Sequence, residues 1–116
     1  MKKQKKLTPI HPGEILREEL LKPLNLSADQ LAAKIHVPVE RVTQILNGED
    51  AIGADTALRL SRFFETSPEF WMNLQSHYEL QVTMDLIAEE LAATIKPYKS
   101  ESTEKKALRK SNEILL

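Results

Sequence analysis

Residues 27–48 have the sequence SADQLAAKIHVPVERVTQILNG, which predicts two short helices joined by a tight turn. Ser27 and Gln30 have the spacing of a capping box, in which the two side chains satisfy backbone amides left open at the start of a helix. We therefore expect the first of the two helices to cover residues 28 to about 34. Pro38 can open the second helix, and the Asn-Gly pair that closes the stretch can end it.

The two short helices form a helix-turn-helix if they cross closely and share one apolar core. The small side chain of Ala32 allows a close crossing. The apolar residues that can then pack together are Leu31, Ile35, Val37, Val42 and Ile45. The outer face of the second helix stays exposed and carries Val39, Glu40, Arg41, Thr43, Gln44 and Asn47. The alternative interpretation is an ordinary pair of helices in a small bundle, because such a pair shows the same pattern.

Helices are predicted on both sides of this stretch, because good helix formers dominate the chain and strand patterns are nearly absent. The preceding helix begins near Pro12, with His11 as its cap, and ends at residues 22–23, where a lysine precedes a proline. The following helix covers about residues 54–65, and Gly53 can cap it. The expected fold class is therefore all-α.

Two more helices and a tail follow in the predicted order. A fifth helix includes residues 70–78, and a sixth covers residues 84–95 and ends at a Lys-Pro pair. Residues 98–116 are rich in Lys, Glu, Ser and Thr, so we expect a flexible charged tail that buries too little apolar surface to order itself. The predicted organisation is a basic N-terminal arm at residues 1–7, one helical domain at residues 8–97, and this tail.

Charge is distributed unevenly along the chain. The 116 residues include 16 Lys and Arg against 17 Asp and Glu, for a formal net charge of -1. Four of the lysines lie at residues 2–6, so the rest of the chain carries five more acidic than basic side chains. An acidic body argues against indiscriminate binding to polyanions.

Several classes of function are disfavoured by what the sequence lacks. The absence of cysteine excludes disulfides, Cys-ligated zinc, iron–sulfur clusters and thiol catalysis. The three histidines are scattered without a metal-binding spacing, and each glycine fits a helix boundary better than a phosphate loop. We therefore expect no enzymatic activity, no metal and no cofactor. Without a long apolar run or a signal-peptide core, we expect a cytoplasmic protein with no membrane partner.

Four blocks of sequence in consecutive order resemble one known family. They are HPGEIL at 11–16, IHVPVERVTQILNGE at 35–49, DTALRLSRFF at 55–64 and TSPEFWMNLQSHYEL at 66–80. These blocks resemble the XRE family of helix-turn-helix proteins, which is the lambda-repressor and Cro type. Within that family they are similar to the HigA-like antitoxins, also called virulence-associated-protein-I-like regulators. The resemblance covers roughly residues 10–80.

The resemblance implies a lambda-repressor-like five-helix DNA-binding domain with an additional C-terminal helix. It also implies that the third helix enters the major groove of double-stranded DNA and that a homodimer binds a palindromic operator. Many relatives in the wider family have glycine in the turn where this chain has His36. We therefore expect His36 to adopt a left-handed conformation.

The resemblance also implies roles for individual residues of the third helix. Val39, Glu40, Thr43 and Gln44 fall where the family meets base edges, and Arg41 and Asn47 fall where bases or phosphates are reached. Chemistry agrees for Gln44, which can pair with adenine, and for the methyl groups of Thr43 and Val39 against thymine. Glu40 could accept from cytosine or only pair with Arg41 or Lys34. Lys34 completes the candidate DNA-binding set.

The predicted dimer needs a surface, and the fifth and sixth helices offer one. One short recognition helix reads few base pairs, whereas two half-sites one helical turn apart double the contact. The apolar residues of these helices exceed what one small core needs. The candidate interface residues are Trp71, Tyr78, Ile87 and Leu91.

Three hypotheses of function follow. The first is an antitoxin of a type II toxin–antitoxin system that neutralises a RelE-like ribonuclease toxin and represses its own operon, as the resemblance implies. The second is a stand-alone XRE-family repressor, and the third is a helical adaptor that binds only protein. An adaptor would leave Arg41 and Gln44 dispensable for DNA binding, whereas both repressor hypotheses require them. A small basic toxin encoded in the adjacent reading frame would favour the antitoxin.

Overall fold

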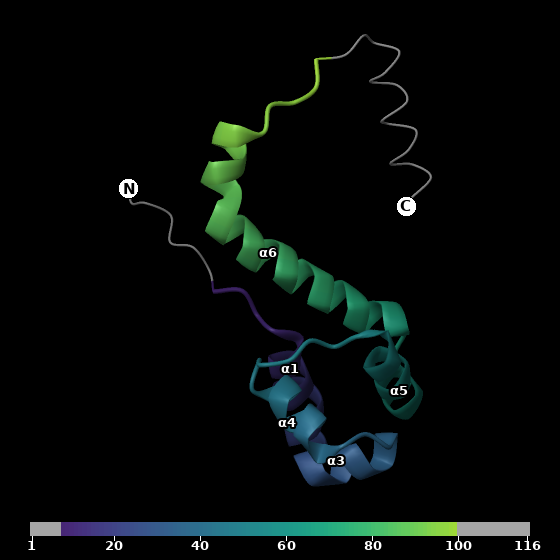
Figure 1. Cartoon of the computed structure of the whole chain (residues 1–116). Helices are drawn as coiled ribbons and strands as arrows, with labels where there is room; N and C mark the ends of the chain where they lie inside the picture. The colour runs from purple at the N-terminus through teal and green to yellow at the C-terminus, as the bar shows by residue number, and fades with distance from the viewer. Residues whose placement is uncertain (1–7, 100–116) are drawn as a thin grey trace. The chain divides into compact units, whose positions relative to one another are not determined.

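The computed structural model describes residues 8–99, and within this range every regular element is helical (Figure 1). The elements in chain order are α1 (Pro12–Ile15), the π-helix η1 (Leu16–Leu21), α2 (Lys22–Leu24), α3 (Ala28–Ile35), α4 (Val39–Leu46), α5 (Ala54–Phe64) and α6 (Pro68–Thr94). The all-α prediction is confirmed. The predicted basic arm at residues 1–7 and the predicted tail from residue 100 onward lie outside the described residues.

The chain divides into two units, residues 1–86 and 87–116. The first unit holds the helix-turn-helix and the buried core, whereas the last turns of α6 belong to the second unit. The predicted domain boundaries at residues 8 and 97 stay predictions. Within residues 8–99, no helix combines the length and apolar character that crossing a lipid bilayer requires.

The first helical segment begins where the sequence predicts and ends slightly later. His11 caps it, because its Nδ1 atom accepts a hydrogen bond of 2.9 Å from the backbone amide of Gly13. The segment continues without a break through α1, η1 and α2. Pro23 does not end it, since proline disfavours but does not forbid helical geometry in the preceding residue. Asn25, with a φ of 58°, ends the segment in the left-handed conformation.

The helix-turn-helix forms as predicted. Both capping-box hydrogen bonds are present: the amide of Gln30 donates to Oγ of Ser27 at 3.1 Å, and the amide of Ser27 donates to Oε1 of Gln30 at 2.9 Å. His36 ends α3 with a φ of 61°, which confirms the expected left-handed turn. Pro38 lies directly before α4. Figure 1 shows α3 and α4 joined by this short turn.

The core of the first unit collects apolar side chains from every helical segment. Trp71, near the start of α6, is completely buried. The remaining buried apolar side chains are those of Leu16, Leu21, Leu31, Ala32, Ile35, Val42, Ile45, Ile52, Ala57 and Leu60. Val37, which the sequence predicts in the core, is only half-buried and packs against it. The turn of the helix-turn-helix therefore lies at the edge of the core.

Gly13 brings the first helical segment against α4. A Cβ atom at this position would collide with the backbone carbonyl of Ile45. Gly13 is buried, so the collision could not be relieved toward solvent. The sequence predicts a helix boundary at Gly13, which is correct, but the close approach of two helices is the stronger reason for glycine there.

The fifth and sixth predicted helices are one continuous helix, α6, and the prediction of two was wrong. Residues 79–83, which separate the two apolar patterns, contain neither glycine nor proline. Nothing in that segment therefore ends the helix. Ser67 caps its start, since the amide of Phe70 donates to Oγ of Ser67 at 3.0 Å.

The close approach at Gly13 predicts a large effect of any side chain there. Gly13→Ser should lower the free energy of unfolding by about 1 to 3 kcal/mol, because overpacking forces the two helices apart. Gly53→Ser is the matched control, since a Cβ at Gly53 meets nothing within 4 Å and serine is a good cap residue. Urea denaturation measures both variants. Equal stability of the two would show that α1 and α4 do not touch at Gly13.

His11 predicts a pH dependence of stability. Burial lowers the pKa of His11 below its ordinary value of 6.5, although the backbone and the carboxylate of Asp50 act in the opposite direction. The unfolded chain then binds more protons than the folded chain, so this contribution is complete above pH 6.5 and is lost as the pH falls through the lowered pKa. The protonated Nδ1 atom also cannot accept the capping bond from Gly13.

The control for this effect is His11→Asn, which keeps a capping acceptor but does not titrate. Denaturation midpoints measured between about pH 5 and 8 should fall toward acid more steeply for the wild type than for the variant. Parallel curves for the two proteins would rule out His11 as the titrating group.

Candidate nucleic-acid interface

Helix α4 presents most of the predicted DNA-binding residues on one helix. Its inward side chains Val42 and Ile45 are buried in the core. The exposed residues around it are Glu40, Thr43, Gln44 and Asn47, whereas Val39 and Arg41 are half-buried. Lys34 is exposed but belongs to α3 and not to α4. The predicted residues of α4 therefore lie on its outer side, and the opposite side of the helix is packed in the core.

The C-terminal end of α4 is fixed from two directions. Arg17 of the first helical segment donates through Nη1 to the carbonyl of Leu46 at 2.7 Å. In the loop that follows, the amide of Ile52 donates to Oε1 of Gln75 at 2.8 Å. Gln75 is buried on α6 and donates in turn to Glu79 at 2.9 Å. Arg17 thus satisfies a carbonyl that the end of a short helix leaves open, and Gln75 satisfies a backbone amide of the loop that follows α4.

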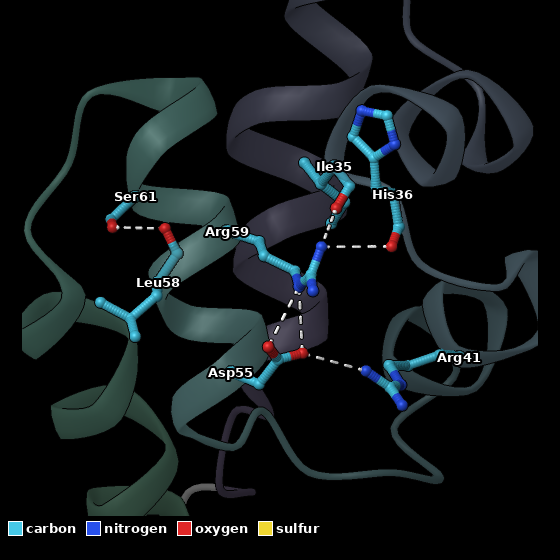
Figure 2. A network of polar contacts seen from close by, with 7 residues as sticks. All are labelled: Ile35, His36, Arg41, Asp55, Leu58, Arg59 and Ser61. Carbon is cyan, nitrogen blue, oxygen red and sulfur yellow. Dashed lines mark hydrogen bonds and ion pairs between the residues drawn. The ribbon is translucent and has the colours of Figure 1, made fainter.

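A second network joins α3 to α5 (Figure 2). Arg59 of α5 donates through Nη1 to the carbonyls of Ile35 and His36, at 2.9 and 3.2 Å. Its Nε atom lies 3.1 Å from both carboxylate oxygens of Asp55, one helical turn earlier. Arg59 thus satisfies carbonyls at the end of α3 and holds a carboxylate at the same time.

The network continues to α4 through Arg41. Nη1 of Arg41 lies 3.3 Å from Oδ2 of Asp55, and Figure 2 shows the carboxylate between the two arginines. Sequence reasoning missed both Asp55 and Arg59. Their spacing of four residues could have signalled an ion pair within α5, but not the contacts to α3 and α4, which depend on how the helices pack.

Cationic side chains gather next to this network. A hollow of about 520 Å³ between α3 and α5 is lined by Lys34, Ile35, His36, Asp55, Leu58, Arg59, Arg62 and Phe63. Lys34 therefore lines the same hollow as Arg59 and Arg62 of α5. Within residues 8–99, no group of three or more His, Asp and Glu side chains is placed to hold a metal ion.

The predicted dimer residues have different environments. Trp71 is completely buried, and its Nε1 atom donates to Oγ1 of Thr66 at 2.8 Å, so its side chain belongs to the core of a single chain. The expectation that Trp71 forms a dimer surface is corrected accordingly. Tyr78 is half-buried, with its ring 4.8 Å from that of His11 in an edge-to-face arrangement. Leu91 is exposed and Ile87 is half-buried.

Comparison with known proteins identifies the family. A helix-turn-helix family model matches residues 16–71. Virulence-associated protein I of Dichelobacter nodosus is 51% identical over 73 residues, which are 63% of this chain and 68% of that protein. A solved addiction module antidote protein of the HigA family from Coxiella burnetii is 49% identical, covers 79% of this chain and 100% of its own, and superposes with a TM-score of 0.76.

The chain belongs to the HigA-like helix-turn-helix family. Another solved member is the Pseudomonas aeruginosa antitoxin HigA with the higBA promoter, which is 42% identical, covers 78% of this chain and 99% of its own, and has a TM-score of 0.77. The family is one of DNA-binding antitoxins and regulators and is not enzymatic. The HigA-like resemblance inferred from the four sequence blocks is thereby confirmed.

The contacts of Arg59 predict that it stabilises the helix-turn-helix. Arg59→Ala should lower the free energy of unfolding by about 1 to 2 kcal/mol, because charged hydrogen bonds to two carbonyls are lost from a partly exposed site. Arg62→Ala is the control, since Arg62 is an exposed arginine of the same helix with no hydrogen bond or ion pair to residues 8–99. Equal losses in the two variants, measured by urea denaturation, would contradict this role.

Proposed function

We propose that this HigA-like protein is a cytoplasmic antitoxin that binds a palindromic operator through α4 and represses its own operon. The exposed polar face of α4, opposite the buried Val42 and Ile45, carries the proposal. A reading surface must be both accessible and fixed in orientation, because hydrogen bonds to base edges require correct geometry. The Pseudomonas aeruginosa HigA structure with promoter DNA supports the same use of the shared fold.

The side chains of α4 suit contacts in the major groove. Gln44 can donate through Nε2 to N7 of adenine and accept through Oε1 from the N6 amino group of the same base, and Thr43 can pack its methyl group on thymine. Arg41 supplies a planar donor fork for guanine or phosphate, and Asn47 offers a further donor and acceptor. Val39 contributes an apolar contact at the start of the helix. Glu40 would accept from cytosine or limit binding to phosphate.

We further propose that the operator complex contains a two-fold homodimer. Two copies of a helix as short as α4 read twice as many base pairs when the half-sites lie one helical turn apart. Apolar residues of α6 that are not buried offer the contact surface, which includes the half-buried Tyr78 and Ile87 and the exposed Leu91 but not the buried Trp71. Lys34 and the lysines of residues 2–6 would add contacts to phosphates.

The partner that we propose for neutralisation is a RelE-like ribonuclease toxin. Residues 7–96 contain 7 basic and 14 acidic side chains. A nuclease that holds RNA needs a basic surface, so opposite charges would speed the encounter of the two proteins. The antitoxin names of related proteins support the assignment. A stand-alone repressor is the alternative, since it would use the α4 face in the same way.

Gln44 tests base reading. Gln44→Ala should weaken binding to the operator by about 1 to 3 kcal/mol and reduce discrimination between sequences, because a bidentate contact to one base is lost. Titrations followed by fluorescence anisotropy, on operator and on a scrambled duplex, measure both quantities. Glu49→Ala, at an exposed position just beyond α4, serves as control. An equal loss on both duplexes would remove Gln44 from base readout.

The neighbouring gene tests the antitoxin assignment. Its product should arrest growth when expressed alone, and co-expression of this chain should restore growth and yield a complex. The complex should weaken as salt is raised, because screening reduces the attraction between an acidic and a basic protein. If no neighbouring product is toxic or co-purifies at low salt, the stand-alone repressor is the better description.

A further inference from the structure

Arg41 is the only cationic residue of α4, and it is already engaged within the chain. Of the residues from Val39 to Leu46, only Arg41 carries a positive charge. Its guanidinium lies 3.3 Å from Asp55, which belongs to α5 and not to the DNA-reading helix. The charge that α4 would bring to a phosphate backbone is therefore partly neutralised before DNA arrives.

Asp55 is also bound by Arg59, a residue of its own helix. Nε of Arg59 lies 3.1 Å from each of its carboxylate oxygens. Arg59 is fixed in turn by the carbonyls of Ile35 and His36 at the end of α3 (Figure 2). The carboxylate is therefore bound from α5 as well as from α4.

We propose that Asp55 is a specificity-determining residue, which positions Arg41 and withholds its charge from DNA of the wrong sequence. The proposal rests on the function proposed above, in which α4 reads bases. Nη1 of Arg41 contacts Asp55, so the rest of the guanidinium fork keeps its other N–H donors. An arginine fixed in this way can meet a base edge of matching geometry without leaving Asp55, and its side-chain entropy is already lost.

Binding to DNA of arbitrary sequence depends differently on Arg41. Such binding comes almost entirely from cations that find phosphates wherever these lie. To reach a phosphate, Arg41 must break its ion pair with Asp55. If the ion pair stays intact, Arg41 contributes little positive charge to binding. Asp55 therefore weakens sequence-independent binding more than operator binding, and the ratio of the two affinities rises.

The size of the effect follows from the exposure of the pair. The side chains of Arg41 and Asp55 are 41% and 62% exposed, so solvent screens their attraction. Exposed ion pairs change an equilibrium by up to about fivefold. An effect of two- to fivefold on the affinity for scrambled DNA is therefore expected, and it should shrink as salt is raised.

The test compares Asp55→Asn with Glu49→Gln, which removes one negative charge from an exposed residue just beyond α4. Each change is made in the wild-type chain and in Arg41→Gln. The probes are a duplex selected from random sequence by the wild-type chain and a scrambled duplex of the same composition. Circular dichroism verifies folding, which Asn at residue 55 should preserve because Arg59 keeps its bonds to α3.

Asp55→Asn should tighten binding to the scrambled duplex about two- to fivefold. It should change binding to the selected duplex less, and should steepen the salt dependence on scrambled DNA. In the Arg41→Gln background, its effect should fall to that of Glu49→Gln. Arg41→Gln by itself should weaken binding to the selected duplex more than to the scrambled one.

Three results would overturn the proposal. The first is an Asp55→Asn effect of the same size with and without Arg41, which would mean that only net charge matters. The second is an unchanged ratio of the two affinities, and the third is a greater loss on scrambled DNA from Arg41→Gln. If the wild-type chain enriches no sequence, the proposal that α4 reads bases fails. The effect of Asp55→Asn on binding to scrambled DNA, compared with and without Arg41, still decides whether Asp55 controls the charge of Arg41. If the wild-type chain binds no duplex, both proposals fail.

Discussion

The close packing of the first helical segment against α4 at Gly13 is the constraint on which the rest of the site depends. With no side chain at this residue, the backbone of α1 reaches the carbonyl of Ile45. The contact fixes the inner side of α4, and Arg17 of the same segment donates to the carbonyl of Leu46, the last residue of α4. An eight-residue helix has little stability of its own, so its orientation must come from such tertiary contacts. The outer face of α4 is positioned as a consequence.

Between residues 8 and 99, charge is arranged in local networks and not as a single basic patch. The body is acidic overall, yet cations gather where α3, α4 and α5 meet. Arg59 binds the carbonyls at the end of α3, and Asp55 connects Arg59 to Arg41 on α4, the helix that we propose reads DNA. An acidic body and a partly neutralised arginine both limit binding to DNA at large. In the function proposed here, recognition then depends more on the neutral donors and acceptors of α4.

Local signals in the sequence predicted local structure well. The capping box at Ser27 and the left-handed His36 both follow from side-chain and backbone chemistry within a few residues. The tertiary role of Gly13 and the contacts of Arg59 with α3 could not be found in this way, because each depends on a partner more than twenty residues distant. Trp71 shows the same limit, since apolar spacing alone does not tell a core position from a dimer surface. The predicted division of α6 failed because a change of apolar pattern does not end a helix.

Whether α4 is the surface that meets DNA can be measured by amide chemical shifts recorded with and without the operator duplex. The account predicts that the largest changes fall on residues 39–47, with smaller ones at Asp55 and Arg59. Buried amides such as that of Ile52 should keep their chemical shifts, because the packing of the helices does not rearrange. Changes concentrated on α6 with an unperturbed α4 would contradict the account.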